Sequence, residues 1–269
     1  MKDYSKIHTA YQSIQGRRRN NQDRASILNT KTLGHPATII VVADGMGGLD
    51  EGDKAAEIAI ATVERYAKEV FPVVIESQEQ LRAAIYQMFK EANGAIYSYG
   101  VDHQLGSIGT TLVFAIILNG RYLVANAGDS RCYYINAHHV SQVTEDHSMV
   151  QELVNEGSMT QEAARRSPYR NQLTNYLGEP GEIRIDIFPT GNNFGIIKEV
   201  SALMVCSDGL HGDLELWKMH QHLLASHKLQ TICDNLVKFA FEKGSTDNIT
   251  IAIAAFGKLS SLAKANGFG

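Results

Sequence analysis

Short apolar runs separated by polar stretches recur along this chain, and several of them border an aspartate. The run 39–43 (Ile-Ile-Val-Val-Ala) is rich in β-branched residues and is followed directly by Asp44 and Gly45. Such a run predicts a buried strand, and the glycine after the acid allows a tight turn at the strand's end. We therefore expect a buried strand that ends at Asp44 and delivers this acid to the rim of a sheet.

Three further apolar runs carry an acid near one end. Asp208 and Asp129 each follow such a run, and Asp247 comes shortly before one. Taken singly, each of these acids is more simply explained as part of an ordinary turn, because aspartate and glycine are common turn residues. Their recurrence at four strand ends is what favours a shared site.

The remaining pattern predicts both helices and strands. Apolar residues recur at helical spacing over 55–70 and 77–99, and Ser77-x-x-Gln80 opens the second helix as a capping box. Asn119-Gly120 between two apolar runs predicts a hairpin, since both residues adopt positive φ readily. The other expected elements are an edge strand at 7–14, hairpin strands at 110–118 and 121–127, a continuation of that meander at 132–135, strands at 183–188, 202–207 and after Asp247, and helices at 149–156, 161–166 and, as a pair, within 214–241.

Strands grouped together, with helices in pairs between them, predict an α+β layered fold with antiparallel sheets. The 269 residues, 44% of them hydrophobic, suffice for one domain over residues 1–257. We expect the small and polar residues 258–269 to form a loosely held tail. No apolar segment approaches the roughly 20 residues that span a bilayer, and the first residues lack the apolar core of a signal peptide. We therefore expect a soluble, cytoplasmic protein without a membrane partner. We also expect it to be a monomer.

Cysteine content and charge narrow the classes of partner. Cys132, Cys206 and Cys233 are odd in number, widely spaced and flanked mostly by apolar residues, which is typical of reduced core positions rather than of disulfides. The net charge of -4 gives no electrostatic reason to expect nucleic acid as a partner, because binding to a phosphate backbone needs a basic face.

The four acids imply metal chemistry if they converge. Carboxylates gathered in one place raise one another's pKa, and such a cluster normally persists only if cations neutralise it. The sequence has no Cys-x-x-Cys pair and no His-Glu-x-x-His pattern. Oxygen ligands alone favour Mg²⁺ or Mn²⁺ over zinc. Two such ions sharing one carboxylate can stabilise both the attacking and the leaving oxygen of a phosphoryl transfer. Asp44 is the candidate for the shared ligand, and Arg18 offers the guanidinium fork that a phosphate needs.

Two motifs typical of other phosphate-binding proteins and phosphatases are matched only in part. Gly47 and Gly52 are spaced as in a nucleotide-binding loop, but Asp53 and Lys54 follow them in place of the lysine and hydroxyl residue of that loop. Cys206 has no arginine six residues later, which argues against the cysteine-dependent phosphatases.

Six stretches, taken in order, resemble the motifs of the metal-dependent protein phosphatases, the PPM or type 2C serine/threonine phosphatases. They are Arg18-x-x-Asn21-Gln22-Asp23, Asp44-Gly45-Met46-Gly47-Gly48, Gly109-Thr110-Thr111, residues 125–131 (Ala-Asn-Ala-Gly-Asp-Ser-Arg), Ser207-Asp208-Gly209-Leu210 and Asp247-Asn248-Ile249-Thr250. The stretch 146–178 further resembles the bacterial branch of this family, where it forms a mobile flap beside the active site.

The resemblance implies a four-layer αββα fold, in which two antiparallel sheets form a central sandwich with helices on both outer faces. It also implies that Asp44 bridges two metal ions, that the carbonyl group of Gly45 binds one of them, and that Asp208 and Asp247 complete the other. The implied cofactors are Mn²⁺ or Mg²⁺, in two or possibly three ions.

The resemblance gives roles to three further residues. Asp129, with Asp208, would hold the third ion, Asp23 would be an outer-shell acid, and Arg18 would clamp the phosphate. The implied reaction is attack of a metal-activated water on phosphoserine or phosphothreonine, without a phosphoenzyme. The chain departs from the family at Met46, where many eukaryotic relatives have a histidine proposed as general acid, because methionine cannot donate a proton.

We therefore expect a bacterial-type protein serine/threonine phosphatase whose partners are substrates of a serine/threonine kinase. Two alternatives stay open. The same site could act on small phosphoesters, which a comparison of phosphoprotein with metabolite phosphates would separate. The fold could also serve as a module that binds phosphoproteins, and binding without turnover would favour that function.

Overall fold

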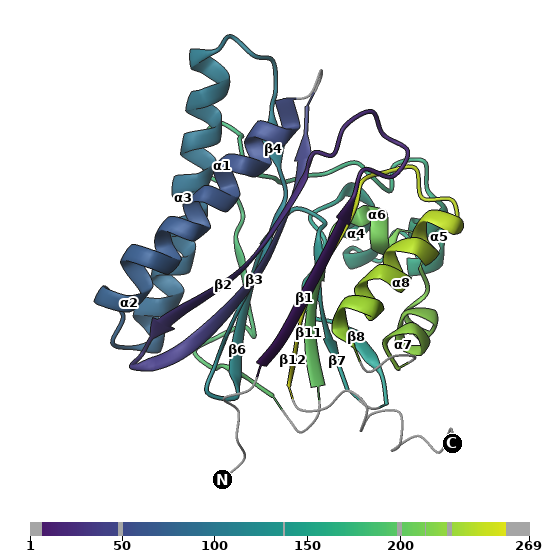
Figure 1. Ribbon diagram of the computed structural model, residues 1–269. Coiled ribbons are helices and arrows are strands. Elements are labelled where there is room, and N and C mark those ends of the chain that lie inside the picture. Colours follow the sequence, from purple (N-terminus) through teal and green to yellow (C-terminus); the bar gives the residue numbers. More distant parts are fainter. Residues whose placement is uncertain are drawn as a thin grey trace.

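The computed structural model describes residues 7–47, 51–136, 138–197, 201–212, 214–224 and 228–256. Within these ranges two antiparallel sheets pack face to face, and helices cover both outer faces (Figure 1). The α+β fold with a central sandwich, expected from the sequence, is confirmed. Gly48 and the tail at 258–269 lie outside the described residues, and the division into one domain and a tail stays a prediction.

One sheet is built from strands distant in sequence. Its order is β1-β12-β11-β7-β8, so β1 lies at an edge as its alternating pattern predicts. Every neighbouring pair in it is antiparallel. The strands are β1 (Ile7–Ile14), β12 (Ile249–Phe256), β11 (Ser201–Cys206), β7 (Arg131–Ile135) and β8 (Val140–Gln142).

The other sheet has the order β10-β6-β5-β3-β2, with β4 paired to β3 and β9 paired to β6. The hairpin of β5 and β6 is confirmed, and Asn119 and Gly120 have φ of 47° and 72° at its turn. The strands are β10 (Gly195–Ile196), β6 (Arg121–Ala127), β5 (Leu112–Leu118), β3 (His35–Met46), β2 (Asp23–Thr32), β4 (Gly109–Thr110) and β9 (Asp186–Phe188).

Two expectations about these strands are wrong. Strand β7 does not continue the meander, because the turn at Gly128, with φ of 107°, leads the chain to the opposite sheet, where β7 pairs with β11. Strand β3 does not end at Asp44 but continues to Met46, since Gly45 and Met46 pair with β4. The glycine at 45 permits close packing rather than a turn, because an added Cβ would lie 2.1 Å from the carbonyl oxygen of Gly52.

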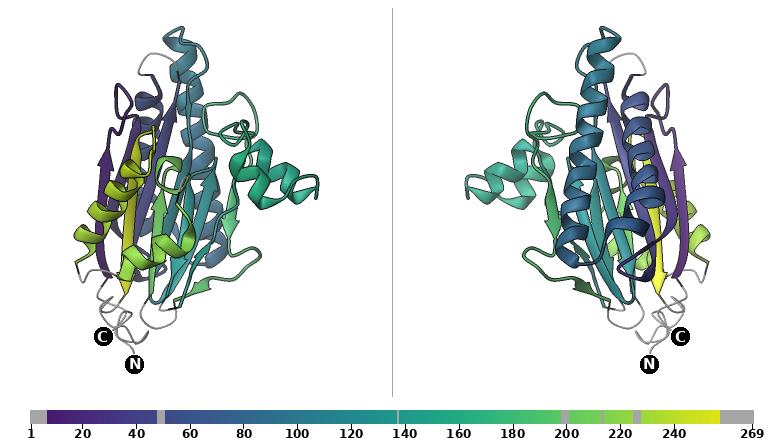
Figure 2. Two further views of the ribbon diagram at one scale, coloured as in Figure 1. Left: turned by 90° about the vertical axis from the view of Figure 1, so that its right-hand side faces the viewer. Right: turned by 90° about the vertical axis from the view of Figure 1, so that its left-hand side faces the viewer.

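Helices form the outer layers. On the sheet that contains β3 lie α1 (Glu51–Arg65), a single π-helical segment η1 (Tyr66–Val70), α2 (Phe71–Val74) and α3 (Gln78–Asp102); on the other lie α6 (Asp208–His211), α7 (Leu216–Leu224) and α8 (Leu229–Glu242). Helices α4 (Met149–Asn155) and α5 (Gln161–Arg166) project away from the sandwich (Figure 2). Ser77 caps α3 as predicted, by accepting a hydrogen bond from the backbone N–H of Gln80.

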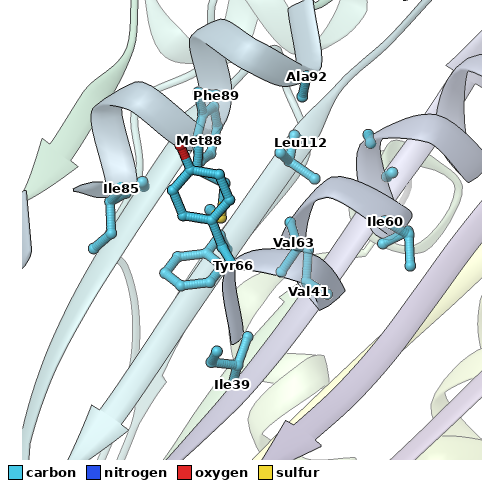
Figure 3. Close-up of a cluster of buried hydrophobic side chains, with 14 of the residues drawn as sticks. Ile39, Val41, Ile60, Val63, Tyr66, Ile85, Met88, Phe89, Ala92 and Leu112 are labelled. Carbon is cyan, nitrogen blue, oxygen red and sulfur yellow. The ribbon is translucent and has the colours of Figure 1, made fainter. Parts of the chain in front are cut away.

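The apolar run in β3 is continuous because both faces of this strand are buried. Ile39 and Val41 face α1 and α3, whereas Ile40 and Val42 face the opposite sheet. Figure 3 shows the first of these clusters, in which Val63 of α1 and Met88 of α3 surround the β3 side chains. All of these side chains are fully buried, so the core holds β3 and its acid in a fixed position.

The three cysteines are buried and unpaired, as expected. Within the described part of the chain, no helix has the length and apolar character needed to cross a bilayer.

Candidate active site

The acids from the four apolar runs gather at one end of the sandwich. Asp44 lies in β3, and Asp23, the first residue of β2, is its direct partner across the strand pair. Asp129 follows β6, Asp208 begins α6 directly after β11, and Asp247 lies just before β12. Figure 1 shows the loop after β1, α6 and the start of β12 together at this end. Antiparallel pairing within the sheets, and packing between them, therefore brings together residues more than 200 positions apart.

The electrostatic environment confirms that these side chains are neighbours. Burial, and then the charges of Asp23, Asp208, Asp129 and Asp247, raise the pKa of Asp44 well above its ordinary value. The carboxyl groups of Asp23 and Asp208 each lie within hydrogen-bonding reach of the Asp44 carboxyl group. We name these five aspartates the acidic cluster.

Burial is the main cause of the raised pKa values in the acidic cluster, and mutual repulsion adds to it. The pKa of Asp23 rises to about 6 and that of Asp208 to about 7. Asp23 Oδ1 and Asp208 Oδ1 are buried oxygens without a hydrogen-bond partner among the described residues. A buried acceptor of this kind is costly unless a cation or a donor satisfies it. The donor set, all oxygen, suits hard divalent ions such as Mg²⁺ and Mn²⁺.

Two residues that the sequence interpretation did not single out hold the acidic cluster in place. Ser207 donates a hydrogen bond of 2.7 Å to Asp23 Oδ2 and accepts one from the backbone N–H of Thr250. Asn248 accepts from the backbone N–H of Gln22 and donates to two carbonyl groups of the loop 15–20. Both residues lie inside the motifs quoted for the resemblance, but only the long-range pairing shows what they contact.

Arg18 lies beside the acidic cluster, where it forms a bidentate ion pair with Asp247. Its Nε and Nη2 donate to the two carboxylate oxygens of Asp247 over 2.9 and 2.5 Å. The sequence suggested a phosphate clamp at Arg18, and here the same guanidinium fork engages a carboxylate. The fork can pair with the two oxygens of a carboxylate or with two oxygens of a tetrahedral phosphate.

The acids converge without forming a coordination shell. In the described ranges, no three acidic, histidine or cysteine side chains surround a common point as metal ligands do. Asp247 is directed to Arg18 and Asp23 is directed to Ser207. An ion that enters the acidic cluster therefore has to compete with Arg18 for the Asp247 carboxylate.

Two histidines near Asp129, His211 and His147, are already engaged by other groups. His211 is buried, and burial lowers its pKa to about 3, so the ring is neutral. Its Nε2 lies 3.1 Å from the carbonyl oxygen of Asp129, so Nε2 carries the hydrogen and donates it there. His147 is likewise committed, since it contacts Asp186 through Nε2 and accepts from the backbone N–H of Gly128 through Nδ1. These contacts leave neither histidine free to act as a general acid.

A cleft of about 1040 Å³ opens beside the acidic cluster. Asp129, Asp208 and Asp247 line it on the side of the sandwich. The rest of its lining includes Gln161, Glu162, Ala164, Arg165, Arg166, Arg170 and Asn171, which belong to α5 and the segment that follows it. The cleft therefore connects the acidic cluster with residues 146–178, which we call the flap.

A substitution at Gly209 tests how closely the backbone segments pack beneath the acidic cluster. A Cβ at this position would lie 1.9 Å from the carbonyl oxygen of Asn248, which belongs to the backbone and has no free side chain to move. We expect Gly209→Ala to lower the free energy of unfolding by about 1–3 kcal/mol, the usual cost of overpacking. Denaturant unfolding measures the change. Gly94→Ala is the control, because Gly94 lies in α3 with nothing within 4 Å. It should stabilise by about 0.5–1 kcal/mol. Equal effects of the two substitutions would contradict the close approach.

A two-sheet sandwich with carboxylates gathered at one end is the architecture of a metal-dependent phosphatase. The model of the family described as Protein phosphatase 2C matches residues 12–236. The chain belongs to this family and is a protein serine/threonine phosphatase of the bacterial branch.

Relatives and solved structures agree with this assignment. The serine/threonine phosphatase stp of Listeria monocytogenes is 32% identical over 249 residues, which cover 92% of this chain and 95% of that protein. The protein phosphatase PhpP of Streptococcus pneumoniae is 30% identical over 241 residues, covering 89% and 93%. The crystal structure of Stp1 from Staphylococcus aureus matches with a TM-score of 0.85 and 27% identity, over 96% of this chain and 98% of that one. The catalytic domain of the phosphatase PstP, solved with two manganese ions, matches with a TM-score of 0.74 and 25% identity, over 93% and 99%.

Proposed function

We propose that the acidic cluster is the metal and catalytic centre at which this phosphatase hydrolyses phosphoserine and phosphothreonine in proteins. The single observation that carries the proposal is the convergence of Asp44, Asp208, Asp247 and Asp129 on one end of the sandwich, with a buried carboxylate oxygen left unpartnered. The two manganese ions in the PstP structure support Mn²⁺ or Mg²⁺ as the cofactor here.

Each residue of the cluster has a proposed role. Asp44 would be the ligand shared by two ions, and Asp208 and Asp247 would complete the binding of one of them. The backbone carbonyl group of Gly45 would be a further ligand, and Asp129 with Asp208 would hold a third ion. When bound, the ions supply an activated water and neutralise charge on the phosphoryl oxygens.

The chain's own side chains orient the substrate and the water. Asp23 is oriented by Ser207 and faces Asp44, so its carboxylate can accept a hydrogen bond from the attacking water. Arg18 binds two phosphate oxygens through its fork once Asp247 is engaged elsewhere, because one guanidinium cannot serve both anions with the same N–H groups. The leaving serine or threonine oxygen receives its proton from solvent, since His211 and His147 donate to or contact other groups.

Turnover with and without divalent ions tests the proposal. The purified chain should hydrolyse p-nitrophenyl phosphate and phosphothreonine peptides with Mn²⁺ and lose both activities with EDTA. A phosphoprotein should be a better substrate than metabolite phosphates, which separates this function from hydrolysis of small phosphoesters. Stoichiometric binding of phosphopeptide without turnover in Mn²⁺ would contradict the proposal.

Metal binding should stabilise the protein more at high pH than at low pH. Without ions, the raised pKa values of Asp23 (about 6) and Asp208 (about 7) mean that the folded state holds protons that the unfolded state releases. Stability of the metal-free protein therefore falls as the pH rises from about 4 towards 7. Ions compete with these protons, so binding strengthens over the same range. We expect a larger rise in Tm on adding Mn²⁺ at pH 8 than at pH 5.5, measured by calorimetry against EDTA. An equal rise at both pH values would argue that the ions bind elsewhere.

We further propose that the enzyme acts in the cytoplasm as a monomer and opposes a serine/threonine kinase. Three buried, unpaired cysteines support a reducing compartment.

A further inference from the structure

The flap carries a group of three arginines close to one another in sequence. Arg165 and Arg166 are the last residues of α5, and Arg170 follows in the next loop. All three are exposed, and all three line the cleft that also contains Asp129, Asp208 and Asp247 of the acidic cluster. Figure 2 shows α5 projecting from the sandwich, so this segment forms the outer rim of the cleft. We call the three residues the flap arginines.

Two of the flap arginines already interact with exposed carboxylates. Arg166 pairs with Glu162 over 3.0 Å, and the two side chains are 80% and 77% exposed. Arg165 is close enough to Glu215, which lies across the cleft just before α7, to add to the lowering of its pKa that Lys218 dominates. Exposed ion pairs of this kind contribute little free energy. A carboxylate of a ligand can therefore replace Glu162 or Glu215 as the partner of the arginine.

Arg131 shows the contrast with a committed arginine. It lies in the same cleft lining but is partly buried, and it forms a bidentate pair with the buried Asp146 over 2.6 to 3.1 Å. Breaking a buried pair leaves an uncompensated charge and is costly. Arg131 therefore anchors Asp146, the first residue of the flap, whereas the flap arginines are exposed on the surface.

Charge distribution decides what the rim can bind. The floor of the cleft is acidic and, in the proposed function, is occupied by divalent ions that attract one phosphate. The rim is basic through the flap arginines, and Glu162 is the acidic residue in the α5 part of the lining. When the phosphorylated residue of a peptide reaches the floor, the residues that flank it in the peptide lie along this rim. A guanidinium recognises carboxylate by charge and by its fork.

We propose that the flap arginines bind acidic side chains next to the phosphorylated residue, so that the preferred substrates are phosphoproteins with Asp or Glu beside the phosphosite. This inference rests on the proposed function, because it assumes that the phosphate is bound at the acidic cluster. The attraction is a surface effect and weakens as salt screens it.

Three phosphothreonine peptides of equal length test the inference, with glutamate, glutamine or lysine at the positions flanking the phosphothreonine. The wild-type protein should show kcat/KM in the order glutamate, glutamine, lysine. The ratio of the glutamate to the lysine peptide should be roughly tenfold at low salt, as expected of a few exposed ion pairs. It should shrink at high salt. The readout is this ratio within one enzyme, so differences in specific activity between preparations cancel.

Charge reversal at the flap arginines tests whether these residues cause the peptide preference. The triple variant R165E/R166E/R170E should invert the ratio, so that the lysine peptide becomes the better substrate. The control K31E/K68E/K90E changes net charge by the same amount at exposed residues outside the cleft lining, and it should keep the wild-type ratio. Glutamine at the three flap positions is a milder variant that should bring the ratio close to one, and it covers the case in which reversal impairs folding.

The outcomes separate this inference from the proposed function. A wild-type ratio of one, or an unchanged ratio in both flap variants, overturns the inference while turnover of p-nitrophenyl phosphate leaves the proposed function standing. If the ratio also inverted in the control variant, the peptide preference would be due to net charge. That result would overturn the inference as well. Absence of any Mn²⁺-dependent turnover in the wild-type protein would reject the proposed function itself.

Discussion

Asp44→Asn should lower kcat/KM on a phosphothreonine peptide by about 10³-fold or more, which exceeds the usual effect of removing a single stabilising group. Asp44 is the member of the acidic cluster whose carboxyl group lies beside both Asp23 and Asp208. The amide has nearly the same shape but lacks the negative charge that holds divalent ions. The substitution therefore removes the proposed ligand without changing the packing around it.

Stability gives the second readout for Asp44→Asn. Because repulsion and burial raise the pKa of Asp44, removing its charge should stabilise the metal-free protein at neutral pH. The rise in Tm caused by Mn²⁺ should become smaller, because binding to the folded state weakens. Asp234→Asn, at an exposed position in α8 outside the acidic cluster, is the matched control and should change neither quantity. Full turnover of Asp44→Asn would exclude the proposed role.

Arg18→Gln should lower kcat/KM by about 10²-fold, mainly through KM, because it removes the two charge-assisted hydrogen bonds that Arg18 is proposed to donate to the phosphate. The same variant should bind Mn²⁺ more tightly than the wild-type protein. Arg18 donates to both carboxylate oxygens of Asp247 in this structure, and glutamine would free them. Opposite changes in the affinities for phosphate and metal are the signature of one guanidinium shared between two anions.

Two further variants sharpen the test of Arg18. Arg18→Lys keeps the charge but loses the fork, so its KM should lie between those of the wild type and Arg18→Gln. Arg17→Gln is the control, since Arg17 stacks on the ring of Phe241 and donates a hydrogen bond to the backbone carbonyl group of the same residue. Isothermal titration with Mn²⁺ in the absence of substrate measures the metal affinity separately from turnover. Unchanged Mn²⁺ affinity in Arg18→Gln would show that the ion does not use Asp247.

Local sequence patterns were sufficient for most elements of the fold. The apolar run in β3, the Asn119-Gly120 turn and the Ser77 cap each depend on a few neighbouring residues, and each is confirmed. The pattern was misleading at Gly45, because glycine is required both by turns and by close backbone contact. The second use depends on the position of Gly52, seven residues away in another element, which no local pattern reports.

The contacts that orient the site were beyond the reach of the sequence. Ser207 with Asp23, Arg18 with Asp247 and Arg131 with Asp146 join residues from different strands and loops. Serine and arginine occur at many surface positions, so their identity alone does not reveal a partner. The flap arginines are visible as residues in the sequence, but their place on the rim of the acidic cleft follows from the way the flap leaves the sandwich.

The sequence by itself determined which segments are buried strands, which acids stand beside them and, through six ordered motifs, the family. The tertiary structure alone decided that Asp23, Asp44 and Asp208 meet in one cluster, and that Arg18 competes there for Asp247. The physical reason is range. Backbone propensity and side-chain periodicity act over a few residues, whereas the position of a carboxylate relative to another depends on strand pairing and sheet packing across the whole chain.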